Sequence, residues 1–274
     1  NGMDQAGCGY YQFTQNNGRR WSTASAYLTP ARSRPNLTII THAITQRVLF
    51  DGKQATGVEI SRRGRKQTIQ GAHVILSGGA VASPQLLEVS GVGDGERLRT
   101  LGIDVVHHAP DVGEHLQDHL LCKVVYATQP EHSINREVQG LRLIPAALRW
   151  FFLREGPLTT GSAPVGAFCH TRDGLEAPDV QIHFASGGTL YNDAGKIRAL
   201  KQPAVTAVVN QSRPESRGSI HAKSANIADA PVIAANYLSS QLDRDTLLRG
   251  MRILLNIFDQ SELQPYLNGR LSPD

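Results

Sequence analysis

Residues 77–93 read SGGAVASPQLLEVSGVG, and this stretch decides the fold. The apolar residues before it predict a short strand over 74–77 that runs into the small residues 78–80. The Ser-Pro pair at 83–84 predicts the start of a helix, and Gly91 predicts its end, because these residue types favour those positions. A strand that leads into a helix through such small residues exposes backbone at the strand's end. Open α/β sheets bind phosphate-bearing cofactors there.

The composition is that of a globular protein. The chain has 274 residues, of which 40% are hydrophobic and 19% charged, enough for one large domain or two ordinary ones. The net charge of +4 would suit a nucleic-acid partner, but the basic residues are scattered. Their one dense run, residues 62–66, lies between strand-like segments at 55–61 and 67–70 and predicts a charged hairpin tip. We therefore expect no nucleic-acid binding.

Three cysteines, Cys8, Cys122 and Cys169, lie far apart and form no CxxC pair. This sparse, odd number argues against a disulfide framework and against a zinc site, so we expect a reducing, cytoplasmic compartment. The histidines show no metal-ligand spacing, and we expect no metal. The longest apolar run, residues 144–153, is interrupted by Arg149 and is too short for a membrane span.

The character of the chain changes near residue 119. Before that point the pattern is α/β, and after it strands with long connections predict an α+β part with a mostly antiparallel sheet and covering helices. The strand-like segments of the second part are 120–128, 165–171, 180–186 and 204–210. We therefore expect two domains, residues 1–119 and residues 120–274.

Two helices are predicted in the second part. Residues 245–258 have a clean apolar face at helical spacing. Residues 145–153 carry Trp150, Phe151 and Phe152, which we expect in the core. The alternative is that one of these aromatic side chains lines a substrate cavity.

The opening stretch is one of several motifs that are spread along the chain. The first is GAVASPQLL at 79–87, which SGVG follows at 90–93; the others are GRRWS at 18–22, AYL at 26–28, RPNL at 34–37, DVGEHLQDH at 111–119, EGPLT at 155–159 and SRGSI at 216–220. Together they resemble the landmarks of the glucose–methanol–choline (GMC) oxidoreductases, which are FAD-dependent enzymes that oxidise alcohols. A lone glycine motif would be weak, and it is the ordered set that makes the resemblance strong.

The resemblance implies that residues 1–119 are the second half of an FAD-binding dinucleotide domain. It implies that residues 120–274 are most of a substrate-binding domain. Family members begin with a GxGxxG loop and end with a catalytic His followed by His or Asn. This chain contains neither, so we expect an internal fragment with no catalytic residue of its own, the catalytic pair lying beyond Asp274.

The implied reaction is oxidation of the CH–OH group of a small-molecule alcohol, with hydride transfer to the flavin. A primary alcohol is the expected substrate. Many choline-type members carry a Glu in the segment where this chain has SAPV at 162–165. Its absence weakens the case for a cationic substrate such as choline.

The resemblance assigns cofactor contacts to Val48, Gly79 and Ala80. Val48 matches a residue that touches the FAD adenine through its main chain, with core packing as the alternative. Gly79 and Ala80 let the backbone approach a dinucleotide, and close helix–strand packing explains them equally well. His115 and His119 are residue types that suit proton transfer, but the resemblance places the base elsewhere.

A function of a different class stays open. The chain could be a catalytically inactive piece, or a non-enzymatic one that needs a complementary chain. A two-domain flavoprotein of the aromatic hydroxylase type is a weaker alternative, because the SPQLL and SGVG motifs are not expected there. Bound flavin would support the FAD-dependent oxidoreductase, and its absence would support the inactive or non-enzymatic piece. A homo-oligomer is compatible with either hypothesis.

Overall fold

The computed structural model describes residues 4–191 and 196–273. The chain forms two compact units, each built from separate segments. The small unit comprises Thr38–Asp118 and Pro214–Ser240, and the large unit comprises Asn1–Leu37, His119–Arg213 and Gln241–Asp274. One boundary lies at His119, where the composition changes. The other boundaries have no counterpart in the sequence prediction, because they arise where distant segments return to pack on an earlier unit.

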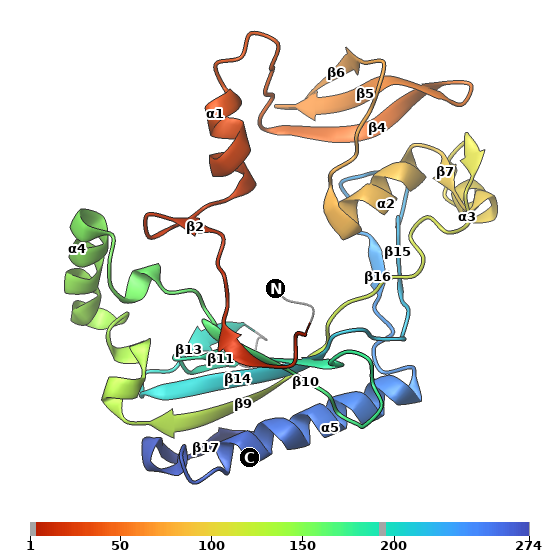
Figure 1. Ribbon diagram of the computed structural model, residues 1–274. Coiled ribbons are helices and arrows are strands. Elements are labelled where there is room, and N and C mark those ends of the chain that lie inside the picture. Colours follow the sequence, from red (N-terminus) through yellow and green to blue (C-terminus); the bar gives the residue numbers. More distant parts are fainter. Residues whose placement is uncertain (1–3, 192–195, 274) are drawn as a thin grey trace. The chain divides into compact units, whose positions relative to one another are not determined.

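The small unit contains a three-stranded antiparallel sheet and two helices (Figure 1). The sheet consists of β4 (Ala43–Asp51), β5 (Gln54–Arg62) and β6 (Arg65–Gln70). The remaining elements are α2 (Gly79–Val89), α3 (Gly95–Thr100), the parallel pair β7 (Val92–Gly93) and β8 (His107–His108), and the antiparallel pair β15 (Ser219–His221) and β16 (Val232–Ala234). The predicted basic hairpin is confirmed: Arg62 pairs with Arg65, and Arg63 and Gly64 both have positive φ.

α2 begins four residues earlier than the Ser-Pro pair predicts. Gly78 is its N-cap, Ser83 lies in the second turn and Pro84 lies inside the helix, so the prediction that Ser83 caps the helix is wrong. Gly79 has a φ of +76°, which a glycine adopts at little cost, and this lets the chain turn into the helix early. The predicted end is confirmed, since Gly91 follows the helix with a φ of +89°.

The strand predicted over 74–77 forms no ladder with any other described residue. Strands of this apolar kind are normally covered on both faces and flanked by neighbours. Within the described residues no such neighbour is present, and Ile75 is 86% exposed. The prediction of a strand over these residues is therefore wrong.

The large unit is built on a six-stranded antiparallel sheet (Figure 1). Its spatial order is β1 (Gly7–Tyr10), β10 (Val165–Cys169), β11 (Val180–Ala185), β14 (Ala204–Gln211), β9 (Leu121–Thr128) and β17 (Leu267–Ser272). Helix α5 (Gln241–Phe258) covers one face: Phe258 stacks on Tyr126, and Gly250 lies against Val180 and Val209. The predicted antiparallel sheet and its covering helix are thus confirmed.

Short elements complete the large unit. They are β2 (Gln15–Asn16), β3 (Arg19–Arg20), η1 (Ala24–Leu28), α1 (Thr29–Ala31), η2 (Pro130–His132), η3 (Ile134–Arg136), η4 (Gly140–Arg142), α4 (Leu143–Leu153), η5 (Pro157–Thr159), β12 (Thr189–Tyr191), β13 (Ile197–Ala199) and η6 (Gln264–Tyr266). No helix in the described part of the chain combines the length and the apolar character that a membrane span requires.

The core placement predicted for the α4 aromatics is wrong for two of the three. Phe151 is 59% and Phe152 is 72% exposed, whereas Trp150 is partly buried. Helical spacing shows which side chains share a face, but it does not show which face another segment covers.

Candidate functional site

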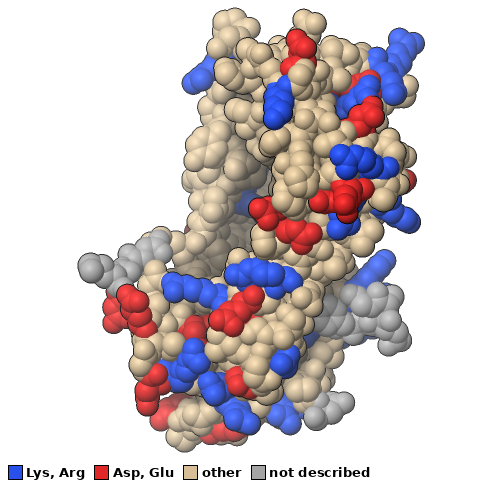
Figure 2. Space-filling model, turned by 90° about the vertical axis from the view of Figure 1, so that its right-hand side faces the viewer, with Lys and Arg blue, Asp and Glu red and all other residues tan. Residues whose placement is uncertain are grey.

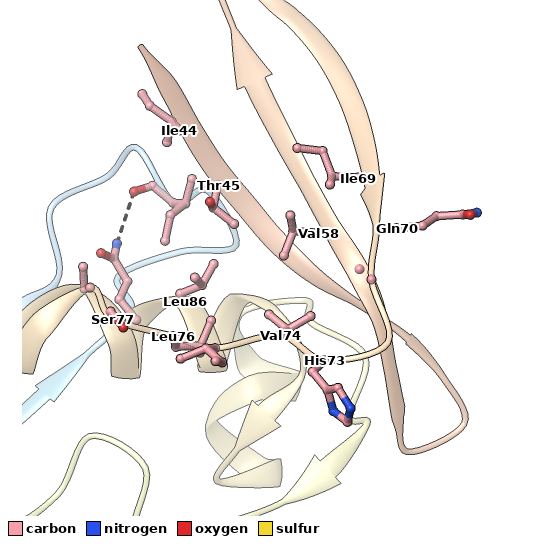
Figure 3. A pocket seen from close by; sticks show the side chains of 17 residues that line it. Ile44, Thr45, Val58, Ile69, Gln70, His73, Val74, Leu76, Ser77 and Leu86 are labelled. Atoms are coloured by element: carbon pink, nitrogen blue, oxygen red, sulfur yellow. Dashed lines mark hydrogen bonds between the residues drawn. The ribbon is translucent and has the colours of Figure 1, made fainter. Parts of the chain in front are cut away.

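A hollow of about 640 Å³ lies in the small unit, between the β4–β5–β6 sheet, the segment before α2 and α2 itself (Figure 3). Most of its lining is apolar, with Ile44, Val58, Ile69, Val74 and Leu76 among the side chains. Apolar pockets with a few polar groups are the usual setting of a small-molecule or cofactor site. The polar groups here include the hydroxyls of Thr45 and Ser77 and the amide of Gln85.

Gln85 ties this hollow to the returning segment of the small unit. Its side-chain amide donates to the backbone oxygens of Asp229 at 2.7 Å and of Ile227 at 3.4 Å. Ile227 itself lines the hollow, and Figure 3 shows one of these bonds. One wall is therefore held in place by a hydrogen-bonded contact between residues more than 140 positions apart.

The first turn of α2 lies at one end of this hollow, which Gly78 and Ala82 line. The N-cap is a glycine, and no side chain caps the helix. Gly79 and Ala80 are exposed, and a Cβ built on Gly79 would meet no atom within 4 Å. Within the described residues, tight packing therefore does not explain Gly79. Uncapped N–H groups at a helix start suit an anion such as a phosphate.

Val48 lies elsewhere. Its side chain is buried, and its backbone N–H donates to the Ser90 hydroxyl at 2.8 Å. It lines a second hollow, of about 740 Å³, on the side where Ile103 and Asp104 lie. Its main-chain contact with a cofactor stays a prediction, with the N–H already taken by Ser90.

Two residues of β4, Ile44 and Thr45, line the first hollow, and the sequence prediction missed the polar one, Thr45. The β4–β5 ladder pairs Thr45 with Ile60 and Arg47 with Glu59, so one residue of β4 is left without a partner. Such bulges re-aim side chains and occur often beside binding sites. A bulge has no signature in the strand's alternation, and the sequence offered no signal for Thr45.

A cluster of three ionisable side chains, of which Glu88 and His221 are buried and Glu114 is exposed, lies in the same unit. Glu88 of α2 is completely buried, and its Oε1 lies 2.8 Å from Nδ1 of His221. The other ring nitrogen, Nε2, lies 2.8 Å from Oε1 of Glu114. The imidazole of His221 therefore lies between two carboxyl groups, one at each ring nitrogen. The backbone N–H of Ala222 donates to the second oxygen of Glu88.

This cluster joins α2, the loop before residue 119 and β15. Gly113 fits beside the ring with a φ of +86°, and a Cβ there would lie 2.8 Å from His221 Nδ1. The sequence prediction missed Glu88 and His221, which are 133 positions apart. No local pattern marks such a pair.

The other histidines noticed in the sequence have modest contacts. His115 is exposed, with a φ of +60°, and its Nε2 lies 3.2 Å from Asp111 Oδ1. His119 Nε2 lies 3.1 Å from the backbone oxygen of Ser212. Asp118 accepts a short hydrogen bond from the Tyr237 hydroxyl, and this bond raises the pKa of Tyr237. Each of these contacts is explained by a side chain that holds its own loop in place.

The large unit carries a polar patch on the sheet face opposite α5. Because Val180 and Val209 contact α5, the alternate residues of their strands face away from it. His183 is one of these, and Lys123 lies on the same face, since each of the two pairs with Val208. The Tyr11 ring lies 5.3 Å from the imidazole.

Burial drives the ionisable groups of this patch toward their neutral forms. It raises the pKa of Tyr11 and lowers the pKa of Lys123. Burial also lowers the pKa of His183, against a smaller opposite effect of its hydrogen bond with Asn210. Perturbed groups gathered on one face are typical of functional sites. The sequence prediction missed them, although the Gln-Ile-His-Phe alternation at 181–184 was a usable signal.

Among the described residues, no group of three or more His, Cys, Asp or Glu side chains has the geometry to hold a metal ion. The three cysteines are free.

Comparisons with known proteins bear on both units. Residues 1–121 match a model of the N-terminal part, and residues 214–273 a model of the C-terminal part, of proteins described as GMC oxidoreductase. The whole chain is 39% identical to mitochondrial choline dehydrogenase of Mus musculus and 36% identical to oxygen-dependent choline dehydrogenase of Staphylococcus haemolyticus. It covers 46% and 48% of these proteins, so the chain spans about half their length.

Solved structures show the same fold. A pyridoxine 4-oxidase from Mesorbium loti superposes with a TM-score of 0.81 at 24% identity, over 98% of this chain and 49% of that one. A formate oxidase superposes with a TM-score of 0.85 at 20% identity, over 95% of this chain and 50% of that one. The expected fold class is confirmed.

Proposed function

The chain belongs to the GMC oxidoreductase family, and from that membership we propose that it forms about half of an FAD-dependent enzyme that oxidises the CH–OH group of an alcohol. The observation that carries the cofactor assignment is the open, uncapped first turn of α2 beside the 640 Å³ hollow. Backbone donors next to an apolar pocket match a dinucleotide's phosphates and its aromatic base.

The small unit is the part that we propose holds FAD. Gly79 and Ala80 offer their N–H groups to phosphate, and Thr45 and Val58 border the space for the adenosine portion (Figure 3). Val48 supports the strand β4 that borders this space, because its backbone N–H is hydrogen-bonded to the Ser90 hydroxyl. When bound, FAD supplies the acceptor for the hydride that leaves the carbinol carbon.

The large unit is the part that we propose faces the alcohol. A neutral His183 can accept a hydrogen bond from a substrate hydroxyl, and Tyr11 and Lys123 add polar contacts on the same sheet face. The segment at 162–165 offers no carboxylate for a cation. A neutral primary alcohol therefore suits this chain better than choline, although the relatives are named choline dehydrogenases.

A second candidate is that this chain is inactive alone and acts only with a complementary polypeptide. The segment at 74–77 favours it, because it forms no ladder with any described strand and Ile75 is exposed. This candidate would be supported if the chain alone folds but is colourless, while the full-length protein is yellow and active.

Compartment and partners are further proposals. Three free cysteines suit a reducing, cytoplasmic setting. On the face drawn in Figure 2, Lys and Arg side chains are interspersed with Asp and Glu rather than gathered into one basic patch. Independence from nucleic acid and assembly into a homo-oligomer stay predictions.

The test uses the full-length protein that contains this sequence. We expect a yellow protein that releases flavin on denaturation and reduces a dye when given primary alcohols. The panel should include choline and neutral alcohols of similar size. A colourless, folded protein with no alcohol-dependent dye reduction would contradict the proposal.

A further inference from the structure

Helix α2 is attached to the small unit mainly through polar side chains. Its buried residues are Gln85, Glu88 and Val89, so the buried side is more polar than apolar. The Glu88 side chain is completely buried, and Gln85 is 5% exposed. Buried polar groups of this kind are costly unless they are hydrogen-bonded, so their partners decide where the helix can lie.

The partners of both polar side chains come from one returning segment of the chain, residues 221–229. Glu88 accepts a hydrogen bond from the backbone N–H of Ala222 and lies 2.8 Å from Nδ1 of His221. Gln85 lies one turn earlier on the same side of α2 and donates to two backbone oxygens of this segment. Hydrogen bonds are directional, and a satisfied buried network selects one arrangement of the elements that it joins. These contacts, termed the α2 clamp, therefore set the rotation and the axial position of the helix.

His221 is held from its other side as well. Its Nε2 lies 2.8 Å from Oε1 of Glu114, in the loop before residue 119. Gly113 leaves room for the ring, because a Cβ at this position would lie 2.8 Å from Nδ1. The two ring nitrogens thus have separate contacts: Nδ1 meets the helix at Glu88, and Nε2 meets the loop at Glu114.

The opposite end of α2 lacks an attachment of this kind. Its N-cap is Gly78, no side-chain hydrogen bond caps it, and Gly79 and Ala80 are exposed. About 14 Å of helix separates Gly79 from Glu88, at a rise of about 1.5 Å per residue. Because one continuous helix joins the two ends, a shift or rotation at Glu88 displaces the N–H groups of the first turn. Such groups bind an acceptor well only within about 2.7–3.2 Å.

We propose that Glu88 and His221 are positioning residues for the cofactor, which hold α2 so that its first turn meets the phosphates. This rests on the proposed function, in which Gly79 and Ala80 offer their N–H groups to FAD. Neither Glu88 nor His221 is among the described residues that line the hollow of about 640 Å³. Their effect on the cofactor is therefore exerted through the helix, not by contact.

The test is titration of the flavin-free, full-length protein with FAD, well below the unfolding midpoint of every variant. His221→Asn and His221→Gln form the matched pair. An asparagine amide takes the place of Nδ1 and a glutamine amide that of Nε2, so only His221→Asn keeps a hydrogen-bonding group next to Glu88. We expect the dissociation constant of FAD to rise about tenfold in His221→Gln and less than about threefold in His221→Asn, because one weakened N–H···phosphate bond has an effect of this size.

Two variants of Glu88 and one control complete the test. Glu88→Ala should weaken FAD binding about tenfold, and Glu88→Gln, which keeps an acceptor for the Ala222 N–H, should restore most of the affinity. Gly250→Val is the stability control, because it crowds Val180 and Val209 in the other unit and leaves α2 unchanged. It should lower stability without changing the dissociation constant of FAD.

The outcomes separate this inference from the proposed function. An unaltered protein that binds no FAD would contradict the proposed function itself. If the unaltered protein binds FAD and the folded His221→Gln variant binds it equally well, the positioning role alone is wrong. A larger loss in His221→Asn than in His221→Gln, or an equal loss in Gly250→Val, would overturn it too. If Glu88→Ala does not fold, the two histidine variants decide.

Discussion

Glu88 and His221 are buried against each other, and the glutamate Oε1 lies 2.8 Å from the imidazole Nδ1. Removing one partner leaves the other buried polar group without its counterpart, which costs more than losing an exposed contact. We expect His221→Leu to lower the free energy of unfolding by about 3–5 kcal/mol in urea titration. The double variant Glu88→Leu/His221→Leu should recover part of that loss. A single substitution with an effect no larger than that of the exposed His107→Leu would contradict this.

Two serines of the stretch 77–93, Ser83 and Ser90, test where helix α2 begins. The sequence predicts a start at Ser83, whereas the structure has Gly78 as the N-cap. Ser90 accepts the Val48 N–H, so Ser90→Ala leaves a buried donor unpaired and should cost about 1–3 kcal/mol. Ser83 lies within α2 and does not cap it, so Ser83→Ala should change stability by less than about 0.5 kcal/mol. Equilibrium unfolding of both variants decides between the two assignments, and a reversed order of effects would restore the cap at Ser83.

Gly79→Ala tests the proposed phosphate contact. Both Gly79 and Gly64 have a φ of +76° and open space where a Cβ would be, so Ala at either position should cost about 1–2 kcal/mol from backbone strain. Only the Gly79 variant should also lose flavin, measured as the ratio of flavin to protein absorbance. An equal flavin content in the two variants would remove Gly79 from the cofactor site.

The pH dependence of stability should report His183. Burial lowers its pKa below the ordinary 6.5, so in the range below 6.5 the unfolded chain binds a proton that the folded protein does not. This term is absent above pH 6.5, and it destabilises the folded protein increasingly as the pH falls. Compared with the unaltered protein, His183→Gln should lose less stability between pH 7 and pH 5 in urea titrations. Parallel profiles would show that burial at this position has no energetic effect.

Gly250 sets how closely α5 approaches the sheet. A Cβ there would lie 3.0 Å from methyl groups of both Val180 and Val209. Gly250→Val should therefore overpack the contact and cost about 1–3 kcal/mol in thermal or urea unfolding. Leu248→Val, on the exposed side of the same helix, is the control and should change stability far less.

Local patterns predicted much of the architecture. Residues 62–66 marked the hairpin tip, and the strand-like segments at 120–128, 165–171, 180–186 and 204–210 correspond to β9, β10, β11 and β14. The apolar spacing over 245–258 marked α5, which begins four residues earlier. These features depend on neighbouring residues, and a sequence shows neighbours directly.

The candidate site was harder to predict. Gly79 and Ala80 were singled out for their small size, and the structure leaves them open at the start of α2, but their contact with a cofactor stays a prediction. Thr45 and His183 were both missed, because distant segments and neighbouring strands decide which side chains line a hollow or are buried. Each depends on register or burial, which alternation alone does not specify.

The sequence by itself determined the family, through ordered motifs, and the type of most elements, through their periodicity. Only the tertiary structure decided that Glu88 lies under His221, that α4 turns its phenylalanines outward and that the two units are discontinuous. The physical reason is common to all three. Burial and pairing depend on which distant segment covers a side chain, and residues far apart in the chain carry no local mark of their meeting.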